Sequence, residues 1–168
     1  PTRRARPAGR RSSVTRRVLV AGIGNVFLSD DGFGVEVATR LSRERLPEGV
    51  RVVDTGIRAR DLAYELVEGG YETAILVDAV ARGGTAGTVY VIEPHPTDRR
   101  TASGGRGDGH SVNPEATLAL VHAMSGVATR ILVVGCEPAC LDEGIGLTAP
   151  VAAAVDEAIS VVRELVCA

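Results

Sequence analysis

The chain has 168 residues, of which 45% are hydrophobic and 24% are charged, a balance typical of one globular domain. Seven Arg and no acidic residue fall within residues 1–17, so residues 18–168 hold 12 Arg against 21 Asp and Glu, a net charge of −9. An acidic body argues against a nucleic-acid partner, and the lack of any apolar run near the roughly 20 residues that cross a bilayer argues against a membrane.

The Arg-rich segment of residues 1–16 is expected to be a disordered arm that precedes a single domain over residues 17–168. Its Arg pairs resemble a twin-arginine export signal, but the run that follows is interrupted by glycines and by Asn25 and lacks a small-residue cleavage site. The three cysteines are an odd and low number that fits reduced thiols better than disulfides. Both observations predict a cytoplasmic protein.

The first half of the chain alternates apolar runs with amphipathic segments. Unbroken apolar runs predict buried strands, whereas apolar residues at helical spacing opposite charged ones predict helices. The predicted order is a strand over residues 16–24, a loop from Asn25 to Gly32, a helix over 33–46, a strand over 50–54, a helix over 58–69 and a strand over 73–80.

The second half continues this alternation around one irregular segment. Residues 94–112 are rich in Gly, Pro and Arg and lack periodicity, so they predict a long loop. The next segment begins Asn-Pro-Glu, a favourable start for a helix. The predicted elements are a strand over 87–93, a helix over 113–124, a strand over 130–136 and a helix over 148–166.

Alternation of buried strands with helices predicts an α/β three-layer sandwich, in which a twisted, mostly parallel five-stranded sheet carries helices on both faces. One connection departs from this pattern. The link between strands 73–80 and 87–93 is Gly-rich and too short for a parallel crossover, so strand 87–93 is expected to run antiparallel.

Polar side chains gather where the parallel strands are expected to end, which is where open α/β sheets bind ligands. They are Asn25, Asp30, Asp31, Asp54, Asp78, Cys136 and Glu137. Asp78 is the most informative, because a carboxylate ending an apolar strand is costly to desolvate unless it is paired or binds a cation. Capping of a neighbouring loop's amides is the alternative. Asp-Asp-Gly is also ordinary helix-start chemistry, so one of Asp30 and Asp31 is expected to cap the following helix while the other faces the crevice.

A dinucleotide-binding loop is the competing interpretation of GIGNVFLSDDGFG, residues 22–34. Gly22 and Gly24 occupy the first two glycine positions of G-x-G-x-x-G, but Phe27 stands at the third. Two aspartates would also repel a pyrophosphate. The segment therefore favours a cation over a phosphate.

An imidazole could complete a metal site with two of these carboxylates. His110 is well placed because it lies just before the N-terminus of a predicted helix, whereas His95 lies in the long loop and His122 inside that helix. Two carboxylates and one imidazole suit a borderline divalent metal with open positions. Cys136 and Cys140 are spaced C-x₃-C without a second pair, which favours two plain thiols over a metal-binding knuckle.

These motifs resemble those of the hydrogenase maturation endopeptidases, which process the large subunit of nickel–iron hydrogenases. The resemblance rests first on VLVAGIGNVFLSDDGFGVEVATRL, which holds the pattern G-x-G-N-x₄-D-[DE]. It continues in order through AILVDAV, GTVYVIE, GHSVNPEATLAL and GCEPACLDEGIGLTAPV, and covers about residues 17–166.

The resemblance implies that Asp31, Asp78 and His110 are the catalytic and metal-binding residues, with His95 as the alternative histidine. The implied metal is nickel carried by the substrate rather than a permanent cofactor. The implied partner is the precursor of a nickel–iron hydrogenase large subunit, whose C-terminal extension the enzyme removes. The alternative is a non-catalytic accessory protein that recognises the nickel-loaded precursor without cleaving it.

Overall fold

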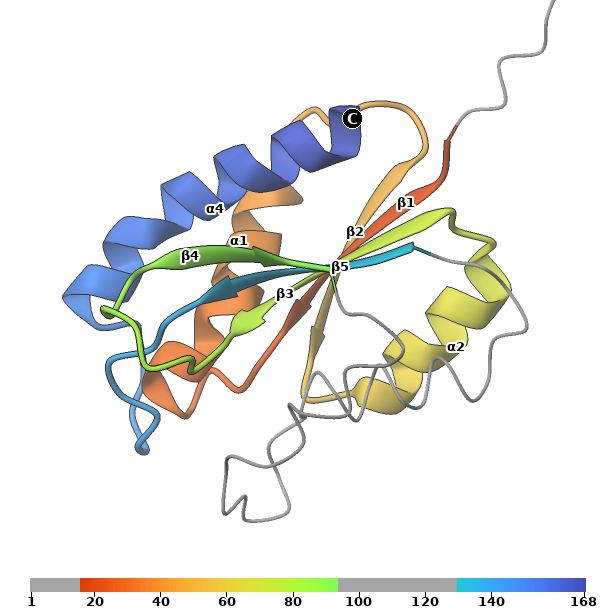
Figure 1. Cartoon of the computed structure of the whole chain (residues 1–168). Coiled ribbons are helices and arrows are strands. Elements are labelled where there is room, and N and C mark those ends of the chain that lie inside the picture. The colour runs from red at the N-terminus through yellow and green to blue at the C-terminus, as the bar shows by residue number, and fades with distance from the viewer. Residues whose placement is uncertain (1–15, 94–129) are drawn as a thin grey trace, which may run out of the picture.

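The computed structural model of the chain describes residues 16–93 and 130–168, and its centre is a twisted five-stranded sheet (Figure 1). The strand order is β2-β1-β3-β5-β4. The strands are β1 (Val18–Ile23), β2 (Val50–Gly56), β3 (Thr73–Ala79), β4 (Val89–Ile92) and β5 (Arg130–Cys136). All neighbours pair in parallel except β4, which runs antiparallel to β5. The predicted sheet and its single antiparallel strand are confirmed.

Helices cover both faces of this sheet, which confirms the three-layer sandwich (Figure 1). They are α1 (Phe33–Leu41), α2 (Ala59–Gly69) and α4 (Ala149–Cys167), with a 3-10 turn, η1 (Ser29–Gly32), before α1. None of these described helices is long and apolar enough to cross a membrane. The predicted loop 94–112, the predicted helix 113–124 and residues 1–15 of the predicted arm lie outside the described residues.

Helix α1 is shorter than the predicted helix over residues 33–46. It ends at Leu41, where the amides of Arg43 and Glu44 bond to the carbonyls three residues earlier instead of four. The backbone thus changes to 3-10 geometry, and the α-helix ends before Pro47. A proline disfavours helical conformation in the residue that precedes it.

The two faces of β1 separate the core into two apolar clusters, because successive side chains of a strand point to opposite sides. Val18 and Val20 pack with α1 and α4 on one face. Leu19 and Ile23 pack on the other face against α2. Fully buried strands of this kind explain the unbroken apolar run in the sequence.

Two glycines allow α1 to begin directly on the sheet. A Cβ atom on Gly34 would stand 2.0 Å from the carbonyl oxygen of Val77 in β3 and 2.3 Å from that of Ile23 in β1. A Cβ atom on Gly22 would stand 2.2 Å from the carbonyl oxygen of Gly34. Only the absence of side chains permits this approach, which brings the turn before α1 to the carboxyl end of β3.

Candidate functional site

Asp78 and Asp31 form a pair of carboxylates at the carboxyl ends of the parallel strands. Asp78 lies in β3, one residue before its end, and is 2% exposed, whereas Asp31 lies in η1 and is half-buried. Burial and then the nearby charge of Asp31 raise the pKa of Asp78 well above its ordinary value of 3.8. The structure thus brings together two of the three predicted site residues.

Few hydrogen bonds offset the free-energy cost of burying these two carboxylates. Asp78 Oδ1 accepts one bond, 2.8 Å long, from the backbone N–H of Ala79, so the capping role considered for Asp78 extends to one adjacent amide. Asp31 Oδ2 accepts one bond of 2.6 Å from the backbone N–H of Asn25. Burial raises the pKa of Asp31, and the Asn25 bond offsets this only in part. Within residues 16–93 and 130–168, no Arg side chain pairs with either carboxylate.

Gly24 explains how the chain turns back to place Asp31. Its φ of 129° lies in the region that favours glycine, and a Cβ atom there would stand 1.7 Å from the carbonyl oxygen of Asp31. The side chain of Asn25 supports the same turn by accepting a bond of 3.0 Å from the backbone N–H of Phe27. The glycines of this segment therefore serve a tight turn that carries a carboxylate.

Asp30 has a different role from its neighbour. It is fully buried, and its carboxylate accepts bonds from the backbone N–H groups of Ala139 (2.8 Å), Cys140 (2.9 Å) and Thr148 (2.6 Å) and from the Thr148 hydroxyl (2.9 Å). Neither η1 nor α1 has a side-chain cap, so the expectation that Asp30 or Asp31 caps the helix is wrong. Asp30 instead joins η1 to the β5–α4 loop, residues 137–148.

Glu137, directly after β5, fixes the loop between β3 and β4. Its buried carboxylate accepts bonds from the backbone N–H groups of Arg82 (2.9 and 3.1 Å) and Gly83 (3.0 Å) and from the Tyr90 hydroxyl (2.9 Å). Burial alone would raise the pKa of Glu137, but these bonds outweigh it and lower the pKa. Glu137 therefore shapes the loop that follows Asp78.

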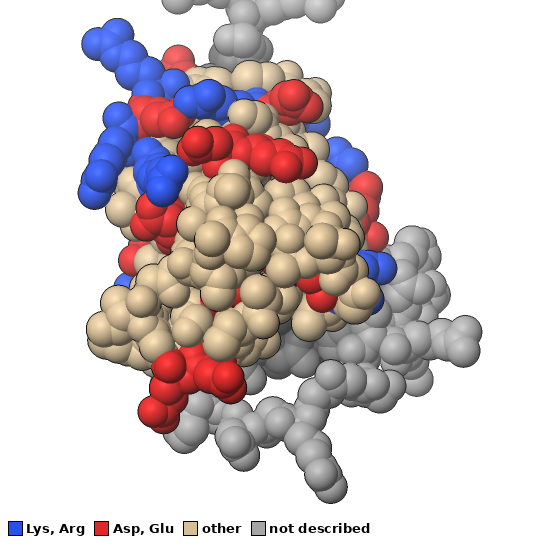
Figure 2. Space-filling view, turned by 90° about the vertical axis from the view of Figure 1, so that its left-hand side faces the viewer, with Lys and Arg blue, Asp and Glu red and all other residues tan. Residues whose placement is uncertain are grey.

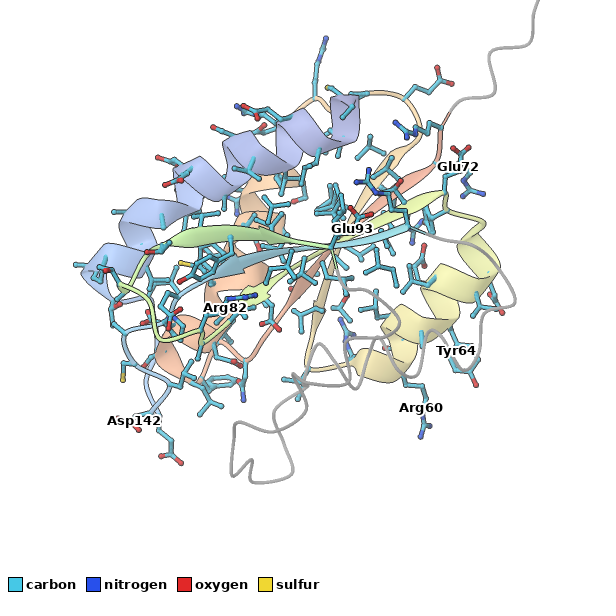
Figure 3. All side chains as sticks on the ribbon, viewed as in Figure 1. Arg60, Tyr64, Glu72, Arg82, Glu93 and Asp142 are labelled. Atoms are coloured by element: carbon cyan, nitrogen blue, oxygen red, sulfur yellow. The ribbon has the colours of Figure 1, made fainter. Side chains whose placement is uncertain are left out.

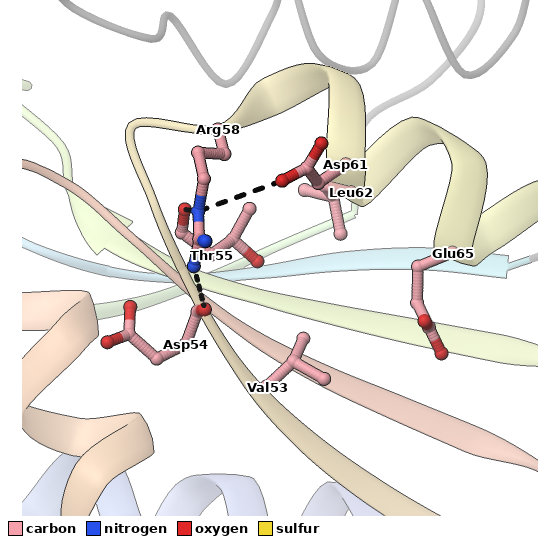
Figure 4. A pocket seen from close by; sticks show the side chains of 7 residues that line it. All are labelled: Val53, Asp54, Thr55, Arg58, Asp61, Leu62 and Glu65. Atoms are coloured by element: carbon pink, nitrogen blue, oxygen red, sulfur yellow. Dashed lines mark hydrogen bonds and ion pairs between the residues drawn. The ribbon is translucent and has the colours of Figure 1, made fainter.

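Asp54, near the end of β2, is exposed and lies beside a cavity of about 140 Å³ (Figure 4). The cavity is lined by Val53, Asp54, Thr55, Arg58, Asp61, Leu62 and Glu65. Arg58 donates to the backbone carbonyls of Asp54 (3.3 Å) and Thr55 (3.4 Å) and lies 3.8 Å from the Asp61 carboxylate. The guanidinium in this cavity is thus engaged by the protein itself.

The third member of the predicted site cannot be placed, because His110 and its alternative His95 lie outside the described residues, as does His122. Among the described residues, no three His, Cys, Asp or Glu side chains come together as a metal site. Cys136 and Cys140 are free thiols. Burial is the main cause that raises the pKa of Cys136 to about 11, so at neutral pH its thiol stays protonated and is a poor nucleophile.

Sequence reasoning missed two structural roles at this edge of the sheet. Asp30 was expected to cap the next helix or to face the crevice, and Glu137 was expected only as an acid near the crevice. Each instead binds backbone amides far away in the chain. Backbone amides carry no residue-specific signal, so no pattern in the sequence could have indicated these contacts.

A family model, curated relatives and solved structures all relate this chain to proteins of hydrogenase maturation. The HycI family model, described as hydrogenase maturation protease, matches residues 35–165. The hydrogenase expression/formation protein HupD of Rhodobacter capsulatus is 35% identical over 153 residues, which cover 89% of this chain and 71% of that protein. A hydrogenase 2 maturation peptidase from a Thaumarchaeota archaeon has 29% identity and a TM-score of 0.65, with 89% of this chain and 97% of that chain covered. The hydrogenase maturating endopeptidase HybD from E. coli shares the fold, with a TM-score of 0.72, 24% identity and coverage of 90% and 92%.

Proposed function

This chain belongs to the hydrogenase maturation protease family, and from that membership we propose that it removes the C-terminal extension of a nickel-loaded large-subunit precursor of a nickel–iron hydrogenase. Nickel is part of the substrate in this proposal, and the enzyme needs no metal of its own. The proposal places the reaction in the cytoplasm, where the free cysteines stay reduced.

The observation that carries the proposal is the pair of Asp31 and Asp78. Burial raises the pKa of both carboxyl groups, and the charge of Asp31 raises that of Asp78 further. A divalent cation between them would offset both the desolvation of the two carboxylates and their mutual repulsion. Because oxygen ligands suit a hard or borderline cation, the pair is matched to a metal presented by the substrate.

We assign the same three residues to recognition and to cleavage. Asp31 and Asp78 supply carboxylate oxygens to the nickel of the precursor, and His110 is the expected nitrogen ligand. Once the nickel is held, the precursor's C-terminal segment lies beside the same carboxylates, where one of them can accept a proton from the attacking water. The half-buried Asp31 is the more accessible of the two to water.

The test is incubation of the purified full-length chain with nickel-loaded precursor, followed by intact-mass analysis. We expect the precursor to lose the mass of its C-terminal extension while the enzyme's own mass stays constant. Binding without any loss of mass would instead support the accessory protein that recognises the precursor without cutting it. A precursor whose cleavage site is blocked by substitution is the matched control.

A further inference from the structure

Four exposed apolar side chains lie on two neighbouring loops close to η1, the turn that contains Asp31. Val26 and Phe27, between β1 and η1, are 42% and 65% exposed. Leu141 and Ile145, in the β5–α4 loop, are 47% and 85% exposed. We call these four residues the apolar platform.

Backbone hydrogen bonds join the two loops into one surface. The N–H of Gly144 donates to the carbonyl of Phe27 (2.9 Å), and the N–H of Ser29 donates to the carbonyl of Gly144 (3.0 Å). The Ser29 hydroxyl adds a bond of 3.0 Å to the carbonyl of Asp142. The four hydrogen bonds that the buried Asp30 carboxylate accepts also join η1 to the β5–α4 loop. The backbone that carries the apolar side chains is therefore ordered before any partner arrives, which reduces the entropy lost on binding.

The grouping of these side chains sets them apart from other exposed apolar residues of the described chain. Ile57, Tyr64 and Val91 are 51–55% exposed but belong to three different places, the β2–α2 turn, α2 and β4. Single exposed apolar residues are common on protein surfaces, whereas a cluster on fixed loops marks an interaction site. Figure 2, which looks onto the side of the molecule that lies at the left in Figure 1, shows a broad face with few charged side chains and with acidic side chains at its lower edge.

We propose that the apolar platform docks the hydrogenase large-subunit precursor and thereby selects which precursor this enzyme processes. The proposal rests on the proposed function. Its main support is continuity with Asp31: Phe27 lies four residues before Asp31 in the same turn, and Asn25 bonds to both. The platform thus adjoins the turn that carries Asp31, and in this proposal a precursor whose C-terminal segment reaches Asp31 also contacts the platform.

The chemistry of the platform defines the surface that it fits. Phe27 and Ile145 offer apolar area that loses contact with water on docking. The exposed acids Asp142 and Glu143 lie between Leu141 and Ile145 in the same loop, so the complementary surface is apolar and also carries basic residues. In this arrangement the carboxylate pair performs the chemistry common to the family, and the platform contributes affinity for one precursor.

The experiment compares steady-state cleavage of nickel-loaded precursor by the wild type and by the double variant Phe27→Ser/Ile145→Ser. We expect KM to rise about 10-fold or more, since central apolar contacts carry most of the energy of an interface. At saturating precursor, kcat should stay within about twofold, because the proposal assigns the reaction to the carboxylate pair and only docking to the platform. Tyr64→Ser is the matched control: Tyr64 is 52% exposed on α2, away from the loop of Asp142 (Figure 3), and its loss should leave KM unchanged.

The outcomes separate this proposal from the proposed function. A wild type that fails to cleave the precursor contradicts the proposed function itself. Normal cleavage by the wild type and an unchanged KM in the double variant overturn the platform alone, as does an equal rise in KM for Tyr64→Ser. A fall in Tm of the double variant by more than a few degrees would assign these side chains to the fold and overturn the platform as well. Concentration-dependent dimers that the double variant abolishes, with KM unchanged, would assign the surface to a second copy of the chain.

Discussion

Replacement of Asp78 by Asn is expected to abolish most cleavage of the precursor while the protein becomes more stable at neutral pH. Asn keeps the shape and the oxygen that accepts a bond from the Ala79 amide, but it lacks the charge that would bind a cation. We expect kcat/KM to fall by at least about 100-fold, the lower end of what a group acting on a proton or a developing charge contributes. Single-turnover cleavage of nickel-loaded precursor measures this loss.

The gain in stability follows from the direction of the pKa shift. Burial, and then the charge of Asp31, raise the pKa of Asp78 well above 3.8. Between the ordinary and the raised pKa, the folded protein keeps a proton that the unfolded chain has released, so the free energy of unfolding falls as the pH rises through this range. Asn does not titrate, so the Asp78→Asn protein does not lose this part of the free energy of unfolding as the pH rises. Each kcal/mol regained at pH 7 should raise Tm by about 2–4 °C, and the difference from wild type should vanish below the ordinary pKa of 3.8.

A matched control for both effects is Asp156→Asn on α4. The Asp156 side chain is 86% exposed and pairs only with Arg40 among the described residues, a surface ion pair that contributes little. Its substitution should leave both cleavage and Tm nearly unchanged. An Asp78→Asn protein that is less stable than wild type at pH 7, or one that cleaves at the wild-type rate, would contradict the functional assignment of this carboxylate.

Asp30→Ala is expected to have the opposite effect, a large loss of stability. It would remove the fully buried carboxylate that accepts hydrogen bonds from the backbone amides of Ala139, Cys140 and Thr148. We expect the free energy of unfolding to fall by about 3–5 kcal/mol and Tm by roughly 10 °C. Thermal and urea unfolding measure the change, and cleavage at low temperature shows whether the residual folded protein is active.

The neighbouring residue provides the control for Asp30. Asp31→Ala removes one described hydrogen bond, that from Asn25, so stability should change by no more than about 1 kcal/mol although cleavage is lost. The two variants should thus separate fold from function at adjacent positions. Equal losses of Tm in both would show that Asp31 also serves the fold.

Acid should remove the contribution of Asp30. Burial alone would raise its pKa, but the bonds from Thr148, Ala139 and Cys140 outweigh this and hold the pKa below 3.8. A lowered pKa means that Asp30 stabilises the fold above its ordinary pKa, and that this contribution is lost as the pH falls through the lowered value. The difference in Tm between wild type and Asp30→Ala should therefore be constant near neutrality and shrink below about pH 4.

The sheet could be predicted from the sequence because its physical causes are local. Apolar runs determine which segments are buried, and the short link before β4 prevents a parallel crossover, so β4 had to run antiparallel. The end of α1 was predicted five residues too late, because the charged residues after Leu41 continue a helical pattern while the backbone already tightens toward Pro47.

The site could be predicted only in part, because the two aspartates of the acidic pair are alike in sequence. Their roles depend on contacts made by backbone amides of residues 139–148, more than 100 positions away. Folding of the β5–α4 loop onto η1 buries Asp30 and leaves Asp31 facing Asp78. The histidine stays a prediction, since His110 and His95 lie outside the described residues.

Cleavage of two matched precursors, one loaded with nickel and one free of it, shows whether Asp31 and Asp78 recognise nickel. The extension should be removed from the loaded precursor alone, because Asp31 and Asp78 gain a favourable interaction only when a cation is presented between them. Treatment of the enzyme with a chelator, followed by removal of the chelator, should not change the rate. Equal rates on the two precursors would show that the carboxylate pair does not recognise nickel, and would overturn the proposed role of Asp31 and Asp78.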